Sequence, residues 1–229
     1  MTRILHLETS TEVCSVCLSE GKNVVLLKES RVVNSHSSQL TILIRECLIE
    51  AGWTFSGLHA VAVSSGPGSY TSLRIGGSTA KGLCFGADLP LIAIDSLSIL
   101  AEGIDRSLVQ ANDFLIPMID ARRMEVYSAV FSSSGQLLQP AEAVILEKTS
   151  FSQLYSNGCS IHICGSGAPK FFELADSKVF HCHHTYTSAK YMVSPAIQAF
   201  QDSNFTELSS YSPDYIKGPH ITETKKKFF

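Results

Sequence analysis

The sequence predicts an α/β protein built as two lobes, each a mixed sheet flanked by helices, in a duplicated architecture. Three observations predict this fold class. The first hundred residues alternate strand-like and helix-like segments in the order β-β-β-α-β-α-β-α. The strand pattern then starts again near residues 104–112. Hydrophobic residues make up 45% and charged residues 17% of the 229 residues, a balance typical of a compact globular protein.

Short apolar runs bounded by polar or glycine-containing turns predict the strands. In the first half these runs cover residues 3–7, 13–19, 23–30, 59–65 and 90–94. In the second half they cover residues 112–120, 123–131 and 160–167, the last of which runs into a Gly-Ser loop. The first three strands are joined by tight turns, so we expect the chain to begin with an antiparallel meander.

Helices are predicted where apolar residues recur at helical spacing. They are expected at residues 37–52, 70–87, 95–104, 168–175 and 192–201. In the first helix the apolar positions follow the i, i+3, i+4, i+7 pattern of an amphipathic helix, with Leu40, Leu43, Ile44, Cys47, Leu48 and Ala51 on one side. Ile42 and Ile49 lie off this stripe and form a second apolar edge.

The expected domain organisation follows from these patterns. Residues 1–106 form an N-terminal lobe, residues 107–212 form a C-terminal lobe, and residues 213–229 form an extended tail. The tail contains Pro and Gly and ends in the basic-aromatic sequence KKKFF, so we expect it to be mobile. The sequence similarity between the two lobes is too weak to reveal the duplication directly.

Charge and cysteine content exclude several classes of protein. The formal net charge of −3 gives no positive field that would attract nucleic acid, so we expect any RNA to be bound mainly by another molecule. No apolar run has the length of a signal peptide core or a membrane span. The seven cysteines have no framework spacing, which predicts a cytoplasmic protein with mostly buried free thiols.

The glycine-rich stretch SSGPGSYTSLRIGGSTAKGL, residues 64–83, raises two alternatives. A glycine loop between a strand and a helix is a possible anion site, but this loop lacks the Gly-Lys-Ser/Thr ending of a P-loop and the dinucleotide fingerprint. The helix itself has small residues on one side, which permits close approach of another backbone. Ser69 or Thr71 is expected to cap the helix.

The small side of this helix can face its own sheet or another chain. It comprises Leu73, Gly76, Gly77, Ala80, Cys84 and Ala87. Glycine often marks close packing inside a lobe, which favours the first alternative. The off-stripe Ile42 and Ile49 on the neighbouring helix also need to be covered, which favours docking of a second chain. We expect the second alternative.

Several segments resemble the TsaB (YeaZ) family of the actin-like superfamily. The glycine stretch closely resembles that family's GPGSFTGLRIG signature, and ILHLETSTEVCSVCL resembles its opening strand and loop. HSSQLTILI, IDARRMEVY and PDYIK resemble its helix start, its second-lobe strand and its C-terminal motif. The similarity is strong in residues 4–95 and 116–127 and thin between 130 and 205.

The resemblance implies an actin-like fold and a role in threonylcarbamoyl modification of the adenosine beside the anticodon of tRNA. It implies docking to a catalytic TsaD-like subunit, addition of a TsaE-like ATPase, and indirect contact with tRNA through that complex. We also expect the same surface to form a homodimer when the chain is alone. The expected partner-binding residues are His36, Leu40, Ile42, Leu43, Ile49, Tyr70, Leu73, Arg74, Gly76, Gly77, Ala80, Lys81 and Cys84.

Two departures from the family pattern argue for a non-catalytic subunit. The superfamily's nucleotide-binding aspartate is replaced by Glu8, and the second histidine of the catalytic relatives' metal site is replaced by Leu40, four residues after His36. No metal site and no firm cofactor are expected, although ATP or ADP at the subunit interface stays open. The alternative function is an independent ATPase or small-molecule kinase, and a metallopeptidase is less favoured. The nucleotide site of such an ATPase or kinase would use Glu8, Thr9, Ser10, Gly165 and Gly167.

Two further clusters are candidate sites. His162, Cys164 and the sequence HCHH at 181–184 contain zinc-binding side chains, but not at the usual ligand spacing, so a coincidental cluster is the favoured interpretation. Asp120, Arg122, Arg123 and Glu125 form either a solvated turn or the polar rim of a partner surface. The terminal KKKFF is interpreted as a solvated tail, with contact to RNA phosphates as the alternative.

Overall fold

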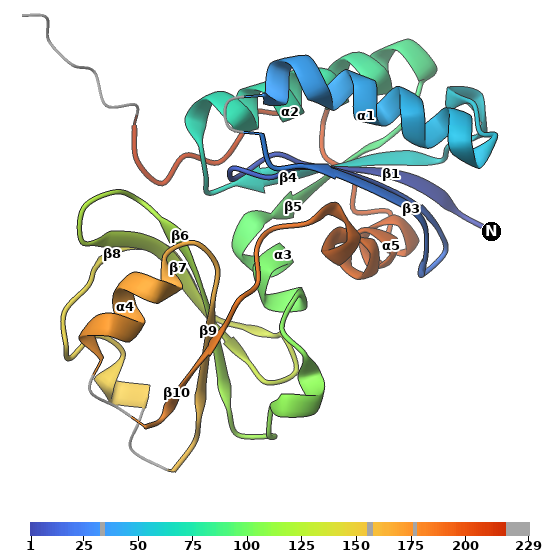
Figure 1. Ribbon diagram of the computed structural model, residues 1–229. Coiled ribbons are helices and arrows are strands. Elements are labelled where there is room, and N and C mark those ends of the chain that lie inside the picture. Colours follow the sequence, from blue (N-terminus) through green and yellow to red (C-terminus); the bar gives the residue numbers. More distant parts are fainter. Residues whose placement is uncertain (33–34, 155–157, 176–177, 219–229) are drawn as a thin grey trace, which may run out of the picture.

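The chain folds into two lobes, each containing one five-stranded sheet (Figure 1). This computed structural model describes residues 1–32, 35–154, 158–175 and 178–218. The strands are β1 Arg3–Glu8, β2 Cys14–Glu20, β3 Asn23–Ser30, β4 Ala60–Gly66, β5 Leu91–Asp95, β6 Phe114–Asp120, β7 Glu125–Ser132, β8 Leu137–Ile145, β9 Ile161–Cys164 and β10 Phe180–His183. The helices are α1 His36–Ala51, α2 Tyr70–Ala87, α3 Ser96–Glu102, α4 Ala168–Leu174 and α5 Val193–Gln201.

The two sheets have the same topology. The first has the order β3-β2-β1-β4-β5 and the second, read from its other edge, has the order β8-β7-β6-β9-β10. In each sheet the first three strands of the chain pair antiparallel, and the fourth and fifth pair parallel. The predicted duplication of mixed sheets flanked by helices is therefore confirmed, although the two halves have little sequence in common.

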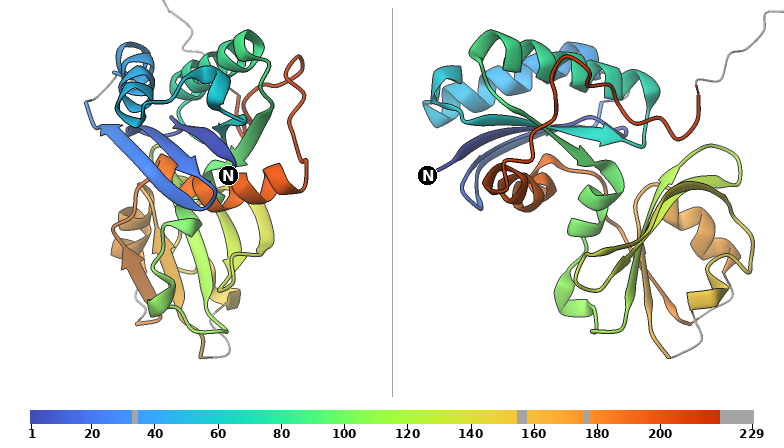
Figure 2. Two further views of the ribbon diagram at one scale, coloured as in Figure 1. Left: turned by 90° about the vertical axis from the view of Figure 1, so that its right-hand side faces the viewer. Right: turned by 180° about the vertical axis from the view of Figure 1, so that it is seen from behind.

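Helices cover both faces of the first sheet (Figure 2). α1 and α2 pack on one face through a core that includes Leu40, Cys47 and Ala80. α5 packs on the other face, where Ala196 and Ile197 contact apolar residues of β1, β4 and β5. Both faces are covered, so the residues of β1 and β4 are buried along nearly the whole of each strand rather than alternating between buried and exposed. α3 packs against both sheets and joins the lobes.

Two strands of the second sheet lie outside the predicted set. β8 has mostly exposed side chains and contains Pro140, so it lacks the apolar run that identifies a buried strand. β10 has only four residues, with two histidines on one side. Both are edge strands, and the weak signal follows from that position.

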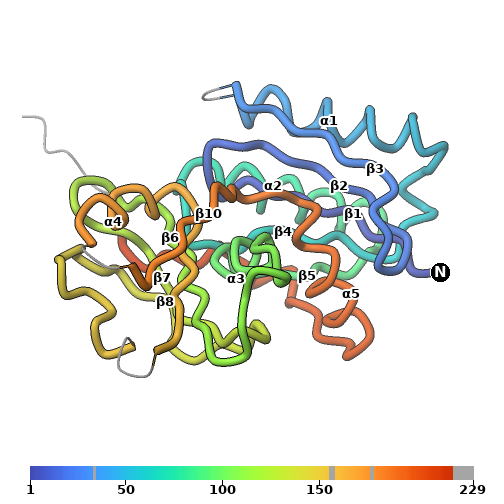
Figure 3. Tube along the Cα trace, turned by 60° about the horizontal axis from the view of Figure 1, so that its bottom comes forward, coloured from blue at the N-terminus to red at the C-terminus, as the bar shows by residue number. Residues whose placement is uncertain are grey.

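The predicted C-terminal lobe, 107–212, is wrong at its end. Figure 3 shows the chain passing from β5 through α3 into the second lobe and returning after β10 to α5. Residues from Ala189 to Ile197 pack on the first sheet beside Ile4 and Ile92. The first lobe is therefore discontinuous in sequence, and its second part follows the second lobe.

Residues 207–217, named the C-terminal strap, pack against α2. Lys81 Nζ donates to the Tyr211 carbonyl at 3.1 Å, and the Asp214 N–H donates to the Ser65 carbonyl at 2.7 Å. The tail from residue 213 onward was expected to be mobile. That prediction is wrong for 213–217, because these residues are held by main-chain and aromatic contacts. The KKKFF sequence lies outside the described residues.

The small side of α2 faces the interior of its own lobe, so the expected docking slot is wrong. A Cβ atom on Gly76 would overlap the Thr9 side chain, and one on Gly77 would lie 3.1 Å from Tyr211 Cε1. The α2 backbone therefore approaches the β1–β2 turn and the strap closely. Eight of the thirteen expected partner-binding residues are buried, namely His36, Leu40, Leu43, Leu73, Gly76, Gly77, Ala80 and Cys84.

The helix ends and the state of the cysteines were also predicted from the sequence. Gly52 ends α1 in the left-handed conformation, and Ser69 caps α2 by accepting a hydrogen bond from the Ser72 N–H, as predicted. The seven cysteines are free and six of them are buried. In the part of the chain that the structure describes, no helix combines the length and apolar character needed to cross a bilayer.

The packing of Gly76 predicts opposite effects for two alanine substitutions in α2. Gly76→Ala should destabilise the protein by about 1–3 kcal/mol, because the added methyl group would overlap Thr9. Gly82→Ala should stabilise it by about 0.5–1 kcal/mol, because Gly82 lies in the same helix facing open space. Urea unfolding measures both. Equal stability of Gly76→Ala and the parent would contradict the close packing.

Candidate functional site

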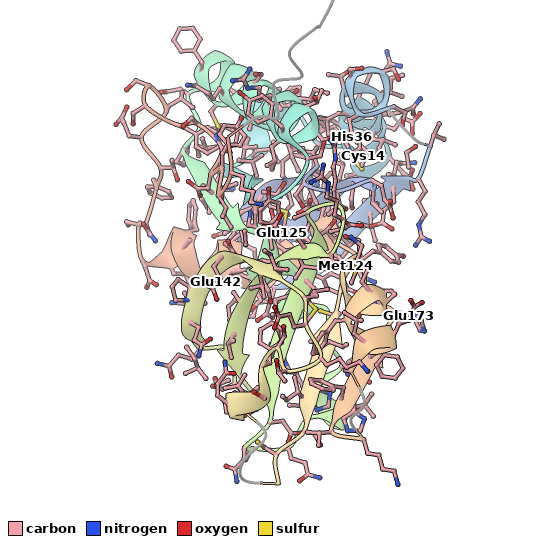
Figure 4. All side chains as sticks on the ribbon, turned by 90° about the vertical axis from the view of Figure 1, so that its left-hand side faces the viewer. Cys14, His36, Met124, Glu125, Glu142 and Glu173 are labelled. Carbon is pink, nitrogen blue, oxygen red and sulfur yellow. The ribbon has the colours of Figure 1, made fainter. Side chains whose placement is uncertain are left out.

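A cleft of about 1270 Å³ lies between the two lobes. Its first-lobe wall comes from the β1–β2 turn, the start of α1 and the loop that leads into α2. Its second-lobe wall comes from the β6–β7 turn and Ser166, and strap residues from Asp214 onward complete the lining. Figure 4 places His36 in the upper lobe and Met124 and Glu125 at the upper end of the lower lobe.

The β1–β2 turn is closed by its own hydrogen bonds. The Thr9 N–H donates to Ser64 Oγ at 3.1 Å, and the Ser10 N–H donates to Glu8 Oε1 at 2.6 Å. The Ser10 carbonyl accepts from the Ser69 N–H at 2.7 Å, so the loop before α2 covers the turn. Glu8, Thr9 and Ser10 are fully buried. The N–H groups of Thr9 and Ser10 are thus used inside the lobe, and the nucleotide-binding role of these three residues stays a prediction.

The second glycine loop is closed in the same way. The Gly165 N–H donates to the Thr185 carbonyl at 3.1 Å, and the Gly167 N–H donates to the Met118 carbonyl at 2.9 Å. A Cβ atom on Gly167 would lie 2.6 Å from Val126 Cγ1. These glycines permit close packing of the loop on β6 and β7, and their role in holding a phosphate stays a prediction.

The β6–β7 turn presents two arginines in the left-handed region. Arg122 has φ 72° and Arg123 has φ 51°, a conformation that costs of order 1 kcal/mol for each non-glycine residue. Asp120 supports the turn, since its Oδ1 accepts from the Arg122 N–H at 2.6 Å and from Lys170 Nζ at 2.5 Å. The solvated-turn interpretation explains these contacts, and a partner-facing rim stays a prediction.

The charges that line the cleft are mixed. The cations are those of Arg122, Arg123 and Lys217, and the carboxylates are those of Glu12, Asp120, Glu125 and Asp214. Among the described residues that line the cleft the carboxylates outnumber the cations, so this part of the lining has no positive excess that would attract a polyanion.

His36 is the first residue of α1 and lines the cleft. Its side chain is 4% exposed, its Nε2 atom has no hydrogen-bond partner, and burial lowers its pKa. The imidazole is therefore neutral at pH 7. Leu40, one turn later, is 1% exposed and belongs to the core between α1 and the first sheet. The position that a second histidine would need is thus occupied by a core leucine.

A histidine network lies along β9 and β10. His162 Nε2 contacts Asp113 Oδ2 at 3.0 Å, and His162 Nδ1 contacts His183 Nε2 at 2.8 Å. Cys164 points instead into the α3 core, where its thiol donates to the Leu100 carbonyl. Within the described ranges no three His, Cys, Asp or Glu side chains are arranged to hold a metal ion. The side chains of Asp113, His162 and His183 pair with one another, and the coincidental-cluster interpretation stays a prediction.

The exposed sides of α1 and α2 carry three of the exposed large apolar side chains of the first lobe, beside those of Val24, Val25, Val32 and Phe55. Ile49 is 72% exposed, Ile42 is 37% exposed and Phe85 is 85% exposed. A Cβ atom on Gly82 or Gly86 would meet no atom within 4 Å. We name Ile42, Ile49, Arg74, Ser78, Gly82 and Phe85 the outer helical surface. Sequence reasoning missed Phe85, although its position opposite the small side of α2 was a usable signal.

Burial also shapes the titration of Glu8. Loss of solvent raises the pKa of Glu8 from an ordinary 4.5 to about 7, and hydrogen bonds from Ser10 oppose part of that rise. Its Oε2 atom has no hydrogen-bond partner. The folded protein therefore keeps a proton on Glu8 between pH 4.5 and pH 7 that the unfolded chain releases.

The free energy of unfolding should consequently fall as the pH rises through this window. Glu8→Gln keeps the acceptor for Ser10 and removes the charge, so its stability relative to the parent should increase from pH 5 to pH 8 by on the order of 2 kcal/mol. Urea unfolding at the two pH values measures this difference. A constant difference between the variant and the parent would contradict the raised pKa.

The sequence matches one family profile and several named proteins. The profile of the family described as TsaD, tRNA N6-adenosine threonylcarbamoyltransferase, matches residues 30–225. The tRNA threonylcarbamoyladenosine biosynthesis protein TsaB of Haemophilus influenzae is 29% identical over 224 residues, which cover 93% of each chain. TsaB of Escherichia coli is 35% identical over 129 residues, which cover 56% of this chain and 54% of that protein.

A solved structure supports the same assignment. The Pseudomonas aeruginosa protein described as uncharacterised with similarity to peptidase YeaZ has a TM-score of 0.81 and 26% identity, covering 95% of this chain and 100% of that chain. The family profile spans most of the sequence, and the relatives that match along its whole length carry the names TsaB and YeaZ. The chain therefore belongs to the TsaD-type tRNA N6-adenosine threonylcarbamoyltransferase family, and within it to the TsaB (YeaZ) group.

Proposed function

We propose that this chain acts in the biosynthesis of threonylcarbamoyladenosine in tRNA as a non-catalytic subunit. It docks a TsaD-like subunit that carries out the transfer, and so assembles or activates the modifying complex. Membership of the TsaB (YeaZ) group is the observation that carries this proposal. The exposed apolar side chains of the first lobe support the proposed docking surface.

The outer helical surface supports docking through α1 and α2. Ile49 and Phe85 are large apolar side chains with most of their area in solvent, and such side chains are frequent anchors of protein interfaces. Gly82 and Gly86 leave the α2 backbone open beside Phe85. A helix of a related subunit can approach closely there, which the buried Gly76 and Gly77 do not allow.

The site geometry supports the absence of catalysis by this chain. His36 has no second histidine one turn away, because Leu40 fills that position from the core. The β1–β2 turn and the second glycine loop have used the N–H groups of Ser10 and Gly167 internally. The alternative of an independent ATPase or kinase is less favoured, because these two N–H groups are not free to bind a phosphate.

The proposal includes the remaining partners expected from the resemblance. A TsaE-like ATPase joins the pair, and the chain contacts tRNA through the complex, in the cytoplasm. Alone, the chain forms a homodimer through the same outer helical surface, as a two-fold symmetric pair. ATP or ADP binds at an interface that a second subunit completes, because the N–H groups of Thr9, Gly165 and Gly167 in the loops of this chain have internal partners.

Docking can be tested by charge substitution at two anchors. Ile49→Asp and Phe85→Asp should each weaken binding to the TsaD-like subunit of the same genome at least ten-fold, because a carboxylate would be desolvated in the interface. Isothermal titration calorimetry measures the affinity. Circular dichroism should not change, since both side chains are exposed.

Ile145→Asp is the matched control. Ile145 is 68% exposed on β8 in the second lobe, away from α1 and α2, so its substitution should leave the affinity unchanged. Parent-like affinity of both helix variants would contradict docking through the outer helical surface. A loss confined to Ile145→Asp would move the interface to the second lobe.

The functional role is tested by reconstitution. Threonylcarbamoyl transfer to tRNA should require this chain in stoichiometric amount beside the TsaD-like subunit, and Ile49→Asp should need a higher concentration for the same rate. Glu8→Gln should support the same rate as the parent, because its carboxyl group is sealed inside the lobe. Equal transfer with and without this chain would contradict the proposed role.

A further inference from the structure

Two connecting segments of the chain join the lobes on one side, and hydrogen bonds lie beside one of these segments. The chain crosses between α3 and β6 and again between β10 and residue 189. Beside the second crossing, Thr11 Oγ1 and Thr187 Oγ1 lie 2.6 Å apart, and Ser188 Oγ donates to Glu29 Oε1 at 2.5 Å. These contacts fix one end of the lobe junction.

The C-terminal strap crosses the cleft from the first lobe to the second. Tyr215 packs on Tyr70 of α2 with ring centroids 4.5 Å apart, and its hydroxyl accepts a hydrogen bond from Arg74 Nε at 3.3 Å. Two residues later, Lys217 forms an ion pair with Glu125 of β7. Among the residues that the structure describes, this is the one ion pair that spans the cleft.

The strap is built into the first lobe before it reaches the cleft. A Cβ atom on Gly66 would lie 2.5 Å from the Asp214 carbonyl oxygen, so the β4 backbone and the strap are in close contact. Tyr211 is nearly buried against the small side of α2. The position of Lys217 therefore follows that of the first lobe, while Glu125 follows that of the second.

We propose that the strap is an interlobe latch, in which the Lys217–Glu125 pair holds the cleft in its closed geometry. The anchored part of the strap, from Tyr211 to Tyr215, acts as a rigid arm, and the ion pair is the releasable end. The pair is partly exposed, so the bias toward the closed geometry is modest and reversible. A molecule that competes for either charge would open the cleft.

A charge-swap experiment tests the latch in the full chain. Spin labels at exposed positions Lys22 of the β2–β3 turn and Glu173 of α4 report the distance between the lobes, in samples diluted with unlabelled chain so that only distances within one chain contribute. Cys182→Ser is in the background because that thiol is partly exposed. Double electron–electron resonance is recorded for the parent, Lys217→Glu, Glu125→Lys and the double variant. Lys28→Glu, which breaks an ion pair inside the first lobe, is the control.

The parent and Lys28→Glu should give one narrow distance distribution. Each single variant should raise the population of longer distances about two- to five-fold, because a like-charge pair replaces the attraction. The double variant should restore the narrow distribution, which shows that the pairing of opposite charges is responsible, and circular dichroism checks that the single variants are folded. Parent-like distributions in both single variants, or a double variant that stays broadened, would overturn the proposal.

Discussion

The close approach of the α2 backbone to the β1–β2 turn is the constraint on which the first lobe depends. Gly76 leaves no room for a side chain beside Thr9, and Gly77 leaves room only for Tyr211 of the strap. The loop before α2 then covers the turn through the Ser69–Ser10 hydrogen bond. Because one side of α2 carries small residues, the β1–β2 turn, the loop before α2 and the C-terminal strap can all pack closely around this helix.

This constraint also decides which surfaces are available for function. With its small side buried and the N–H groups of the β1–β2 turn used internally, α2 offers a partner only its outer side, which carries Phe85 and the open Gly82. The cleft stays large, but its charges are mixed. The two-lobed fold thus presents the outer side of α2 as the surface that we propose for assembly with a partner, in line with membership of the TsaB (YeaZ) group.

The sequence predicted the two sheets because their inner strands are short apolar runs. It also predicted the end of α1 at Gly52 and offered Ser69 or Thr71 as the cap of α2, of which the structure has Ser69. Helical spacing groups Gly76 with Gly77, but it does not say whether that side meets the sheet or another chain. The edge strand β8 and the strap escaped prediction, since neither has a periodic apolar pattern. Their positions are set by contacts with distant parts of the chain.

The central claim is that a TsaD-like subunit covers the outer side of α2. Photo-crosslinking tests it most directly, with p-benzoylphenylalanine introduced at Phe85 and, separately, at Ile145, both of which are exposed. The account predicts a covalent product with the TsaD-like subunit from position 85 and none from position 145. A product from position 145 alone, or none from position 85 in a complex that elutes intact from size exclusion, would contradict it.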